Sequence, residues 1–478
     1  MTALPGTEPV PQHDPGSALA PGWHHGAFMQ VFVRAYRDAD GDGVGDLRGL
    51  AQSLDYLQHL GVRGLWLMPI HPSEDGDHGY AVTDYRAIDP AYGTLDDFDA
   101  LLREAHARGI GVIIDYVINH SASTHPLFGS PQHRDWYLRR DPPPAGWTIY
   151  CADPWRRDDA GGAYFAAFSR RMPDFDWRHP GVAAWHHDNL RFWLNRGVDG
   201  FRFDAVGHLV ENGPDAWDCQ PENYPIMAAI RRLLDGYERR FMVCEAPGDP
   251  QGFARVAGSA FAFDINQRFV DAARGDPEAL AAVARYFTQA PPSISTMLSN
   301  HDAFAGARVH DQLGGDLARM KLAAALYLLM PGTPFIYYGE EVGMAGHPAL
   351  GADPGLRTPM SWCALGRGFS DAMPFRPASP NAATHNVAAQ RDDACSLHAF
   401  YRALLALRNA RRSLAEGDYR VERLDGPLLV VRRRHGDELT EVVLRIDDGA
   451  LPAPPAGARP LLDEVASGVA VYALSPAR

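Results

Sequence analysis

Two short apolar runs of the chain each end on a carboxylate. Residues 200–204 end on Asp204, and residues 241–245 end on Glu245. A third acid, Asp302, follows the polar pair that closes a third apolar run. If these runs are parallel strands, their carboxyl ends meet at one edge of a sheet. Three acids placed there have the arrangement needed to cut a glycosidic bond.

The two principal acids have neighbours that suit different chemical roles. Arg202 lies two residues before Asp204 and therefore shares its face of a strand. A guanidinium beside a carboxylate keeps it ionised, as a nucleophile requires at neutral pH. Four apolar residues precede Glu245, and an apolar setting raises a carboxyl pKa, which suits a general acid. The alternatives are a structural ion pair for Arg202 and Asp204 and a helix-capping role for Glu245.

Further polar residues are candidates for the same rim. Asp115 and His120 end the apolar run 111–120, and His301 precedes Asp302. The histidines can bind sugar hydroxyls, and Tyr80 can stack on the apolar face of a sugar. Each residue also has a structural alternative: Asp302 as a turn or N-cap residue, the histidines as hydrogen-bonded buried groups, and Tyr80 as a packing residue.

A loop of alternating acids at residues 38–46 suggests a cation site. The pattern, with a glycine at its sixth position, resembles the first half of an EF-hand loop, but the twelfth position is Gly49 rather than Glu. Clustered carboxylates repel one another, and a hard cation would relieve that repulsion. The alternative is a solvated acidic turn. We expect a structural Ca²⁺ or Mg²⁺ held by Asp38, Asp40, Asp42, Asp46 and the carbonyl of Val44.

The elements that must position these residues alternate along the chain. About eight short apolar runs, including 199–204, 240–245 and 260–264, are separated by helical stripes, which predicts an α/β fold with a TIM (β/α)8 barrel. After residue 412 the period changes to two, which predicts an antiparallel β-sandwich. The predicted organisation is a disordered arm (1–22), a barrel (23–120 and 181–412), an inserted small domain after the third strand (121–180) and a C-terminal β domain (413–478).

Composition limits the classes of partner. The 478 residues are 46% apolar and carry a net charge of −14, which disfavours nucleic acid and anionic membranes and suits a neutral sugar. The five cysteines form no CxxC pair, so we expect free thiols, although one disulfide stays open. No apolar run reaches the ~20 residues of a membrane span. We expect a cytoplasmic protein without an organic cofactor, and a secreted mature form is the alternative. Nothing in the sequence indicates an oligomeric state.

Several of these segments resemble the conserved regions of glycoside hydrolase family 13, the α-amylase family. The matching segments are 115–120, 200–205, Glu245 and 300–302, in the family's order. The resemblance implies a retaining reaction through a covalent glucosyl-enzyme, with the two carboxyls about 5–5.5 Å apart. It implies Asp204 as nucleophile, Glu245 as acid/base, Asp302 as a binder of ring hydroxyls, Arg202, His120 and His301 as orienting groups, and Tyr80 as a stacking platform.

Within this family the sequence favours one kind of substrate. Asp77, three residues before Tyr80, resembles the aspartate that binds the terminal glucose in exo-acting α-glucosidases. We therefore expect hydrolysis of short α-linked gluco-oligosaccharides, with α-1,4 linkages favoured and exo action. A transglucosidase, or an isomerase of sucrose-, maltose- or trehalose-type disaccharides, is the alternative. A third possibility is a non-catalytic barrel that serves as a binding partner, which the presence of all three acids disfavours.

Overall fold

The computed structural model describes residues 4, 6–75, 78–158, 161–364 and 368–475. The chain divides into two compact units. The first contains residues 1–21, 66–106 and 111–260, and the second contains residues 22–65, 107–110 and 261–478. β2 (Gly64–Leu67) lies at a boundary between them. No described helix is both long and apolar enough to cross a lipid bilayer.

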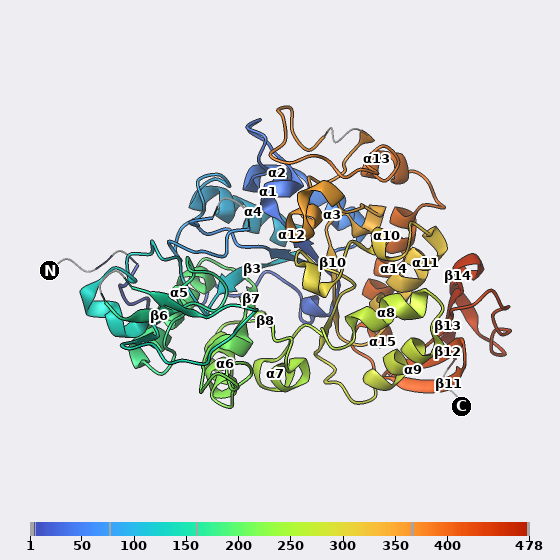
Figure 1. Cartoon of the computed structure of the whole chain (residues 1–478). Helices are drawn as coiled ribbons and strands as arrows, with labels where there is room; N and C mark the ends of the chain where they lie inside the picture. Colours follow the sequence, from blue (N-terminus) through green and yellow to red (C-terminus); the bar gives the residue numbers. More distant parts are fainter. Residues whose placement is uncertain (1–3, 5, 76–77, 159–160, 365–367, 476–478) are drawn as a thin grey trace. The chain divides into compact units, whose positions relative to one another are not determined.

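The first unit is built on three parallel strands. β3 (Gly111–Val117), β7 (Gly200–Asp204) and β8 (Phe241–Cys244) pair in the order β8-β7-β3, and all of their residues are buried. Figure 1 shows them next to one another. Strands buried on both faces must be continuously apolar apart from functional positions. The helices that alternate with them are α4 (Leu95–Ala107), α5 (Pro180–Asn195), α6 (Asn223–Leu234) and α7 (Pro250–Ala257).

Buried Asp199 fixes the start of β7. Its Oδ2 accepts hydrogen bonds from the amide of Val112 at 2.8 Å and from Nε2 of His106 at 2.7 Å. Its own amide and carbonyl bond to β3 and β8, respectively, through Val112 and Phe241. One side chain thus joins α4 to β3 and sets the register in which the strand ends are aligned.

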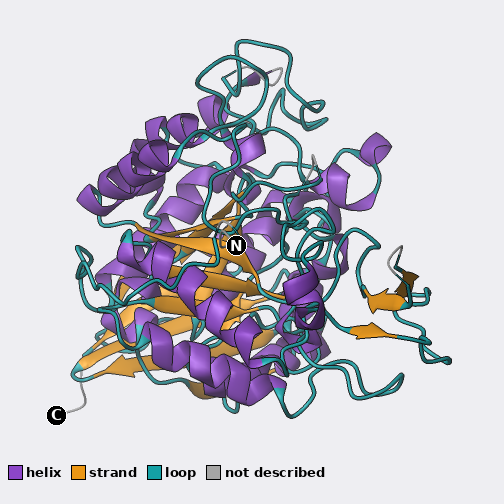
Figure 2. Ribbon diagram, turned by 90° about the vertical axis from the view of Figure 1, so that its left-hand side faces the viewer, coloured by secondary structure: helices purple, strands orange, loops and turns teal. Residues whose placement is uncertain are grey.

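The segment of the chain between β3 and α5 forms a small sheet. β4 (Arg139–Arg140), β6 (Ala163–Phe165) and β5 (Trp155–Arg157) pair antiparallel in that order. A hydrophobic cluster that includes Leu138, Ile149 and Phe165 supports this sheet. The short 3₁₀ helix η2 (Pro131–Trp136) precedes it, and long loops, teal in Figure 2, complete the segment. The domain boundaries that we drew from the sequence stay predictions.

The N-terminal arm differs from the disordered segment that we expected. Residues 8–21 have almost no regular secondary structure, yet the amide of Val10 donates to Asp188 at 3.1 Å and the amide of His13 donates to Asn195 at 3.0 Å. The side chain of Gln12 donates to the carbonyl of Gly236 at 2.7 Å. The proline-rich composition suggested disorder, but long-range bonds to α5 and to the end of α6 hold the extended arm in place.

The second unit contains its own parallel strands and helices. β1 (Phe28–Val31), β10 (Thr333–Tyr337) and β9 (Ser295–Thr296) pair in that order. The strand expected at residues 260–264 is reduced to two isolated bridges, one at Ala260 and one between Phe261 and Ser295. The strand does not continue because the chain turns into α8 within a few residues. The main helices are α2 (Leu47–Gln52), α3 (Leu54–Leu60), α8 (Asn266–Ala273), α9 (Pro277–Tyr286), α11 (Leu317–Leu328) and α14 (Leu397–Ala410).

Shorter helices of this unit lie mostly in its loops. They are α1 (Val33–Tyr36), α10 (Val309–Gln312), α12 (Ala352–Leu356), α13 (Val387–Gln390) and α15 (Arg412–Ala415). Much of residues 339–395 is irregular, as the density of glycine and proline predicts.

The C-terminal part of the second unit is one antiparallel sheet rather than a two-sheet sandwich over the described residues. Its order is β11-β12-β13-β15-β14. β12 and β13 form a hairpin, in which His435 pairs with Glu438 across a tight turn. Helices α9, α11 and α15 pack on the sheet and cover it, as a second sheet would in a sandwich. The strands are β11 (Arg420–Asp425), β12 (Leu428–His435), β13 (Glu438–Arg445), β14 (Arg459–Glu464) and β15 (Val469–Leu474).

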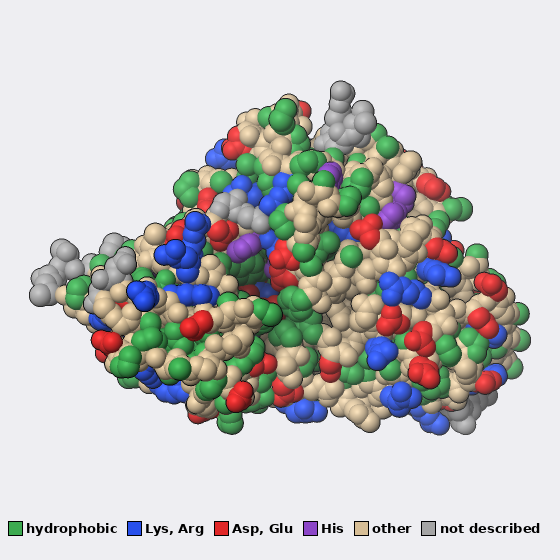
Figure 3. Space-filling view, in the orientation of Figure 1, with side chains coloured by type: hydrophobic (Ala, Val, Ile, Leu, Met, Phe, Trp, Pro, Cys, Tyr) green, Lys and Arg blue, Asp and Glu red, His purple; other side chains and the backbone are tan. Residues whose placement is uncertain are grey.

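The structure agrees with the expectation of free thiols. Figure 3 shows acidic and basic side chains interspersed over the face that it draws. All five cysteines lie in the described part of the chain and are free thiols.

Candidate active site

The ends of β3, β7 and β8 bring four predicted residues together in the first unit. In the parallel register Asp115 is opposite Arg202, and Phe203 is opposite Cys244, the residue before Glu245. Arg202 and Asp204 share one face of β7, as the period of two requires. The predicted meeting of these side chains is confirmed by their contacts.

Arg202 is the centre of this group. Its Nη1 lies 2.9 Å from Asp115 Oδ1 and 2.6 Å from Asp204 Oδ1, and its Nη2 lies 2.8 Å from Glu245 Oε2. The arginine is fully buried. One guanidinium therefore contacts three carboxylates, and its rigid planar fork fixes their positions relative to one another.

Asp115 is the anchor of this arrangement rather than a group open to substrate. It is fully buried. Its Oδ2 accepts hydrogen bonds from Trp66 Nε1 at 3.1 Å and from the hydroxyl of Tyr80 at 3.0 Å. The guanidinium carbon of Arg202 lies 5.1 Å from the centre of the Trp66 ring. The sequence did not reveal Trp66, because an indole donor in an apolar strand looks like packing.

Burial and charge give the two principal carboxyls different proton affinities. Burial raises the pKa of Asp204 to about 6 against the pull of Arg202, and burial raises that of Glu245 to about 7. The hydrogen bond between the two side chains lowers the pKa of Asp204 and raises that of Glu245. Glu245 therefore holds the proton at a pH at which Asp204 is already ionised.

The close contact of the two acids also limits their separation. Carboxyl groups of inverting glycosidases stand roughly 6.5–9.5 Å apart to admit a water molecule, whereas retaining enzymes need about 5–5.5 Å. Asp204 and Glu245 interact with each other and share one guanidinium, which agrees with the short separation of a retaining pair.

His120, three residues after the end of β3, supplies a neutral nitrogen. Burial lowers the pKa of His120 to about 3, so the imidazole is uncharged at neutral pH. Its Nδ1 is 3.4 Å from Asn119 Nδ2, while its Nε2 is buried without a hydrogen-bond partner among the described residues. The ring packs 5.4 Å from that of Phe168. An unsatisfied buried nitrogen is costly unless a ligand occupies it, which fits the predicted role in binding a hydroxyl.

The loop before Tyr80 is only partly described. Asp77, which we expected to bind a terminal glucose, lies outside the described residues. Asp75 shapes the loop instead: it accepts the amides of Gly79 at 3.0 Å and Ala81 at 3.1 Å. Tyr80 is 8% exposed, so its ring is almost enclosed.

In the second unit, Asp302 and His301 form a separate polar pair. His301 is buried, and its Nδ1 bonds to Gln30 Nε2 at 2.8 Å, while its Nε2 is 3.1 Å from Asp302 Oδ2. Arg357 donates to Asp302 Oδ1 at 3.0 Å and to the carbonyl of His301 at 2.9 Å. His301 and Arg357 thus orient the Asp302 carboxylate, which is partly open to solvent. No pattern in the sequence indicated Arg357, which is 55 residues from its partner.

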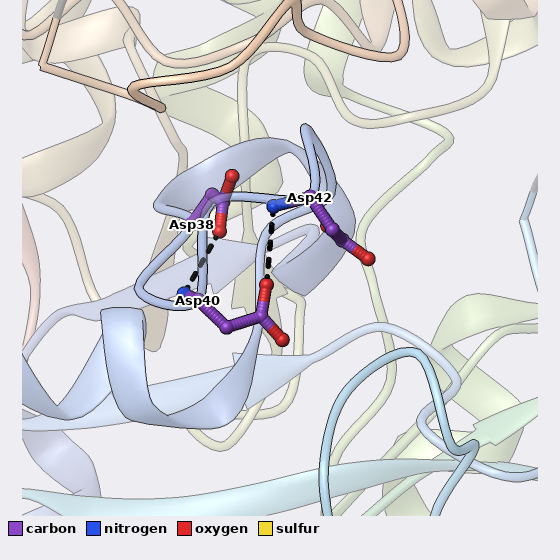
Figure 4. Close-up of side chains that lie close together, drawn as sticks. All are labelled: Asp38, Asp40 and Asp42. Atoms are coloured by element: carbon purple, nitrogen blue, oxygen red, sulfur yellow. Dashed lines mark hydrogen bonds between the residues drawn. The ribbon is translucent and has the colours of Figure 1, made fainter.

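The acidic loop of the second unit brings three of its predicted ligands together. Oxygens of Asp38, Asp40 and Asp42 lie within 4.8 Å of one another (Figure 4). Burial, and then the charges of the neighbouring acids, raise the pKa of Asp40. Asp46 is not part of this cluster. It accepts the amide of Gly49 as the N-cap of α2 and the amide of Ala39, both at 2.7 Å.

Comparisons with known proteins agree with this geometry. Residues 30–417 match the family model described as alpha amylase, catalytic domain. The trehalose synthase/amylase TreS of Mycobacterium tuberculosis is 32% identical, over 92% of this chain and 85% of its own length. A probable alpha-glucosidase of Rhizobium meliloti is 31% identical, over 90% of both chains.

Solved structures agree too. The crystal structure of the alpha-glucosyl transfer enzyme XgtA is 27% identical, with a TM-score of 0.84 over 95% of this chain and 99% of that one. The barrel with a C-terminal antiparallel sheet that was predicted from the sequence is thus the fold of this chain. The chain belongs to the α-amylase family of glycoside hydrolases and is a glycosidase.

Proposed function

We propose that this protein cleaves short α-linked glucosides with retention of configuration, with Asp204 as the nucleophile and Glu245 as the acid/base. The observation that carries the proposal is the shared guanidinium of Arg202, which holds both carboxyls in contact while their environments separate their pKa values to about 6 and about 7. Pairs of acids whose surroundings push their proton affinities apart are typical of glycosidases.

The reaction has two balanced steps. In the first, an oxygen of Asp204 bonds to the anomeric carbon while the bond from that carbon to the leaving oxygen breaks, and Glu245 gives its proton to the leaving oxygen. In the second, the hydroxyl of an incoming water or sugar attacks the same carbon and passes its proton to Glu245. The bond to Asp204 then breaks and restores the carboxylate. Arg202 balances the charge of Asp204 before and after each step.

Binding groups complete the proposal. His120 offers its Nε2 to a sugar hydroxyl, and Tyr80, whose hydroxyl is bonded to Asp115, offers its ring as the stacking platform. Asp302 and His301 of the second unit, which Arg357 contacts, keep the role of binding ring hydroxyls that the family resemblance implies. Asp77 as the residue that imposes exo action stays a prediction.

The names of the relatives support a glucosyl donor. They include an α-glucosidase, a trehalose synthase/amylase and an α-glucosyl transfer enzyme. The last two support a second candidate function, in which a sugar rather than water receives the glucosyl group. Short α-glucosides with α-1,4 linkages are the proposed substrates in both cases.

Trapping the intermediate tests the proposal directly. Incubation with a 2-deoxy-2-fluoro-α-glucosyl donor with a good leaving group should add one fluoroglucosyl mass to a peptide that contains Asp204. The variant Asp204→Asn should gain none. Label on another residue, or β-glucose as the first product from maltose, contradicts the assignment. Product analysis on maltose, maltotriose, sucrose and isomaltose then separates hydrolysis from transfer and isomerisation.

We also propose a structural Ca²⁺, or Mg²⁺, at the acidic loop. The donor set fits a hard cation, because carboxylate oxygens of Asp38, Asp40 and Asp42 lie close together and their negative charges repel one another. The carbonyl of Val44 belongs to the proposed ligand set, and Asp46 serves the loop through its backbone bonds. Chelation should lower the melting temperature, and Asp40→Asn should abolish the response to chelator. Identical melting curves with and without chelator would remove this cation.

A further inference from the structure

The requirements of folding alone do not explain the backbone conformation of Tyr150. It sits with Cys151 at the tip of a two-residue turn in the first unit, where Ile149 and Ala152 exchange backbone hydrogen bonds of 2.8 and 2.9 Å. Both tip residues have positive φ angles, 48° and 65°. Such turns favour Asn and Gly, and a bulky side chain in this region is strained. Strain of this kind concentrates at functional sites.

The strained turn presents an aromatic ring to solvent. Tyr150 is 60% exposed, whereas most large aromatic residues of this chain are buried. Its hydroxyl bonds to Nε2 of His208 at 3.0 Å. Trp217 lies 5.8 Å from the Tyr150 ring and stacks on His208 at 5.2 Å with an angle of 11°. The exposed ring is thus held at its outer end and backed by a second aromatic side chain.

This aromatic group continues to the proposed reaction centre within the same unit. Phe168 lies 5.7 Å from Tyr150, 5.2 Å from His208 and 5.4 Å from His120, and it is 39% exposed. Enclosure of the Tyr150 hydroxyl, and then the negative charges of Asp218, Glu245 and Asp204, raise its pKa. The phenol therefore stays protonated at neutral pH.

We propose that the ring of Tyr150 stacks on the sugar that leaves from, or attacks, the anomeric carbon, and so determines whether the glucosyl group passes to a sugar or to water. This inference rests on the proposed function. Pyranose rings present apolar C–H faces that favour aromatic surfaces. A water molecule gains nothing from such a surface, so the ring favours the sugar selectively.

Transfer to a sugar follows the same bond changes as the second step of the reaction. With a sugar as acceptor, its hydroxyl oxygen bonds to the anomeric carbon, the bond from that carbon to Asp204 breaks, and the hydroxyl proton moves to Glu245. The product is a longer α-glucoside instead of glucose. No further reactant is needed.

The test measures the division of one intermediate between two acceptors. With α-glucosyl fluoride as the donor, fluoride release reports formation of the glucosyl-enzyme, and free glucose reports its hydrolysis. The difference between them is transfer to added maltose. In Tyr150→Gly, the ratio of transfer to hydrolysis at a fixed maltose concentration should fall about tenfold, because one aromatic contact is lost. Tyr150→Phe keeps the ring and should keep the ratio within about twofold.

Cys151→Gly is the matched control, because it relieves the same turn and leaves the ring in place. Its ratio should equal that of the unchanged protein. An unchanged ratio in Tyr150→Gly, or an equal fall in Cys151→Gly, overturns the inference. An equal fall in Tyr150→Phe shows that the hydroxyl rather than the ring acts, and this also overturns it. If the unchanged protein releases no fluoride, the proposed function itself fails.

Discussion

Replacing Asp204 by Asn should abolish catalysis and at the same time stabilise the fold. The carboxyl has a pKa of about 6 in the folded protein, raised by burial from 3.8. Each pKa unit corresponds to 1.36 kcal/mol, so ionised Asp204 costs the folded state about 3 kcal/mol above pH 6. Asn keeps an oxygen that can accept from Arg202 and carries no charge.

The sign of the effect follows from the direction of the shift. Because the folded state binds the proton more tightly than the unfolded chain, the stability contributed by this group is fully present below about pH 4. It is lost as the pH rises through about 6. Asp204→Asn should therefore melt like the unchanged protein near pH 4. At pH 8 it should melt higher by about 3 °C, taking an unfolding entropy of about 1 kcal/mol per degree for a chain of this size.

The assay is thermal unfolding at pH 4, 6 and 8 beside kcat/KM on an activated α-glucoside. Activity should fall by at least about 10⁴-fold. The exposed Asp84 supplies the control, because Asp84→Asn makes the same change of net charge in the same unit at a carboxylate that solvent reaches. A melting temperature that falls at pH 8, or a shift equal at pH 4 and pH 8, would refute the electrostatic reasoning.

Three further predictions follow from the same contacts. The pH dependence of kcat/KM should be bell-shaped, falling below about pH 6 as Asp204 gains a proton and above about pH 7 as Glu245 loses one, with both limbs belonging to the pair; a profile flat from pH 5 to 8 would contradict this. Arg202→Lys should lower kcat/KM by about 10² or more, because one ammonium cannot hold three carboxylates, and activity within a fewfold of the original would show that the fork is dispensable. Trp66→Phe removes one donor from buried Asp115 and should cost about 1–3 kcal/mol of unfolding free energy, measured by urea denaturation; no change would mean that water replaces the indole.

The sequence predicted that Arg202, Asp204, Asp115 and Glu245 would meet because the relevant rules are local. Alternation along β7 places Arg202 beside Asp204, and parallel strands end at a common edge, so Asp115 and Glu245 had to approach them. Helix starts are equally local: Thr94 and Asp97, three residues apart, exchange hydrogen bonds at the start of α4.

Contacts between distant segments could not be predicted in this way. Arg357 reaches Asp302 from 55 residues away, and the sequence does not encode that distance in any pattern. Asp46 fits two patterns, a ligand loop and an N-cap, and the structure shows it as the cap. The strand expected after Ser259 is reduced to bridges because the same residues also begin the turn into α8.

The arrangement around Arg202 has a consequence for inhibitor design. With Glu245 protonated, one positive charge stands against the two ionised groups Asp115 and Asp204, so the centre carries an excess of one negative charge. Sugar mimics with a basic ring nitrogen should exploit this excess, whereas neutral lactone mimics should not. The preference for the amine over the lactone should widen as Glu245 titrates, so a screen run in mildly alkaline buffer would rank the two chemotypes differently from one run in acid.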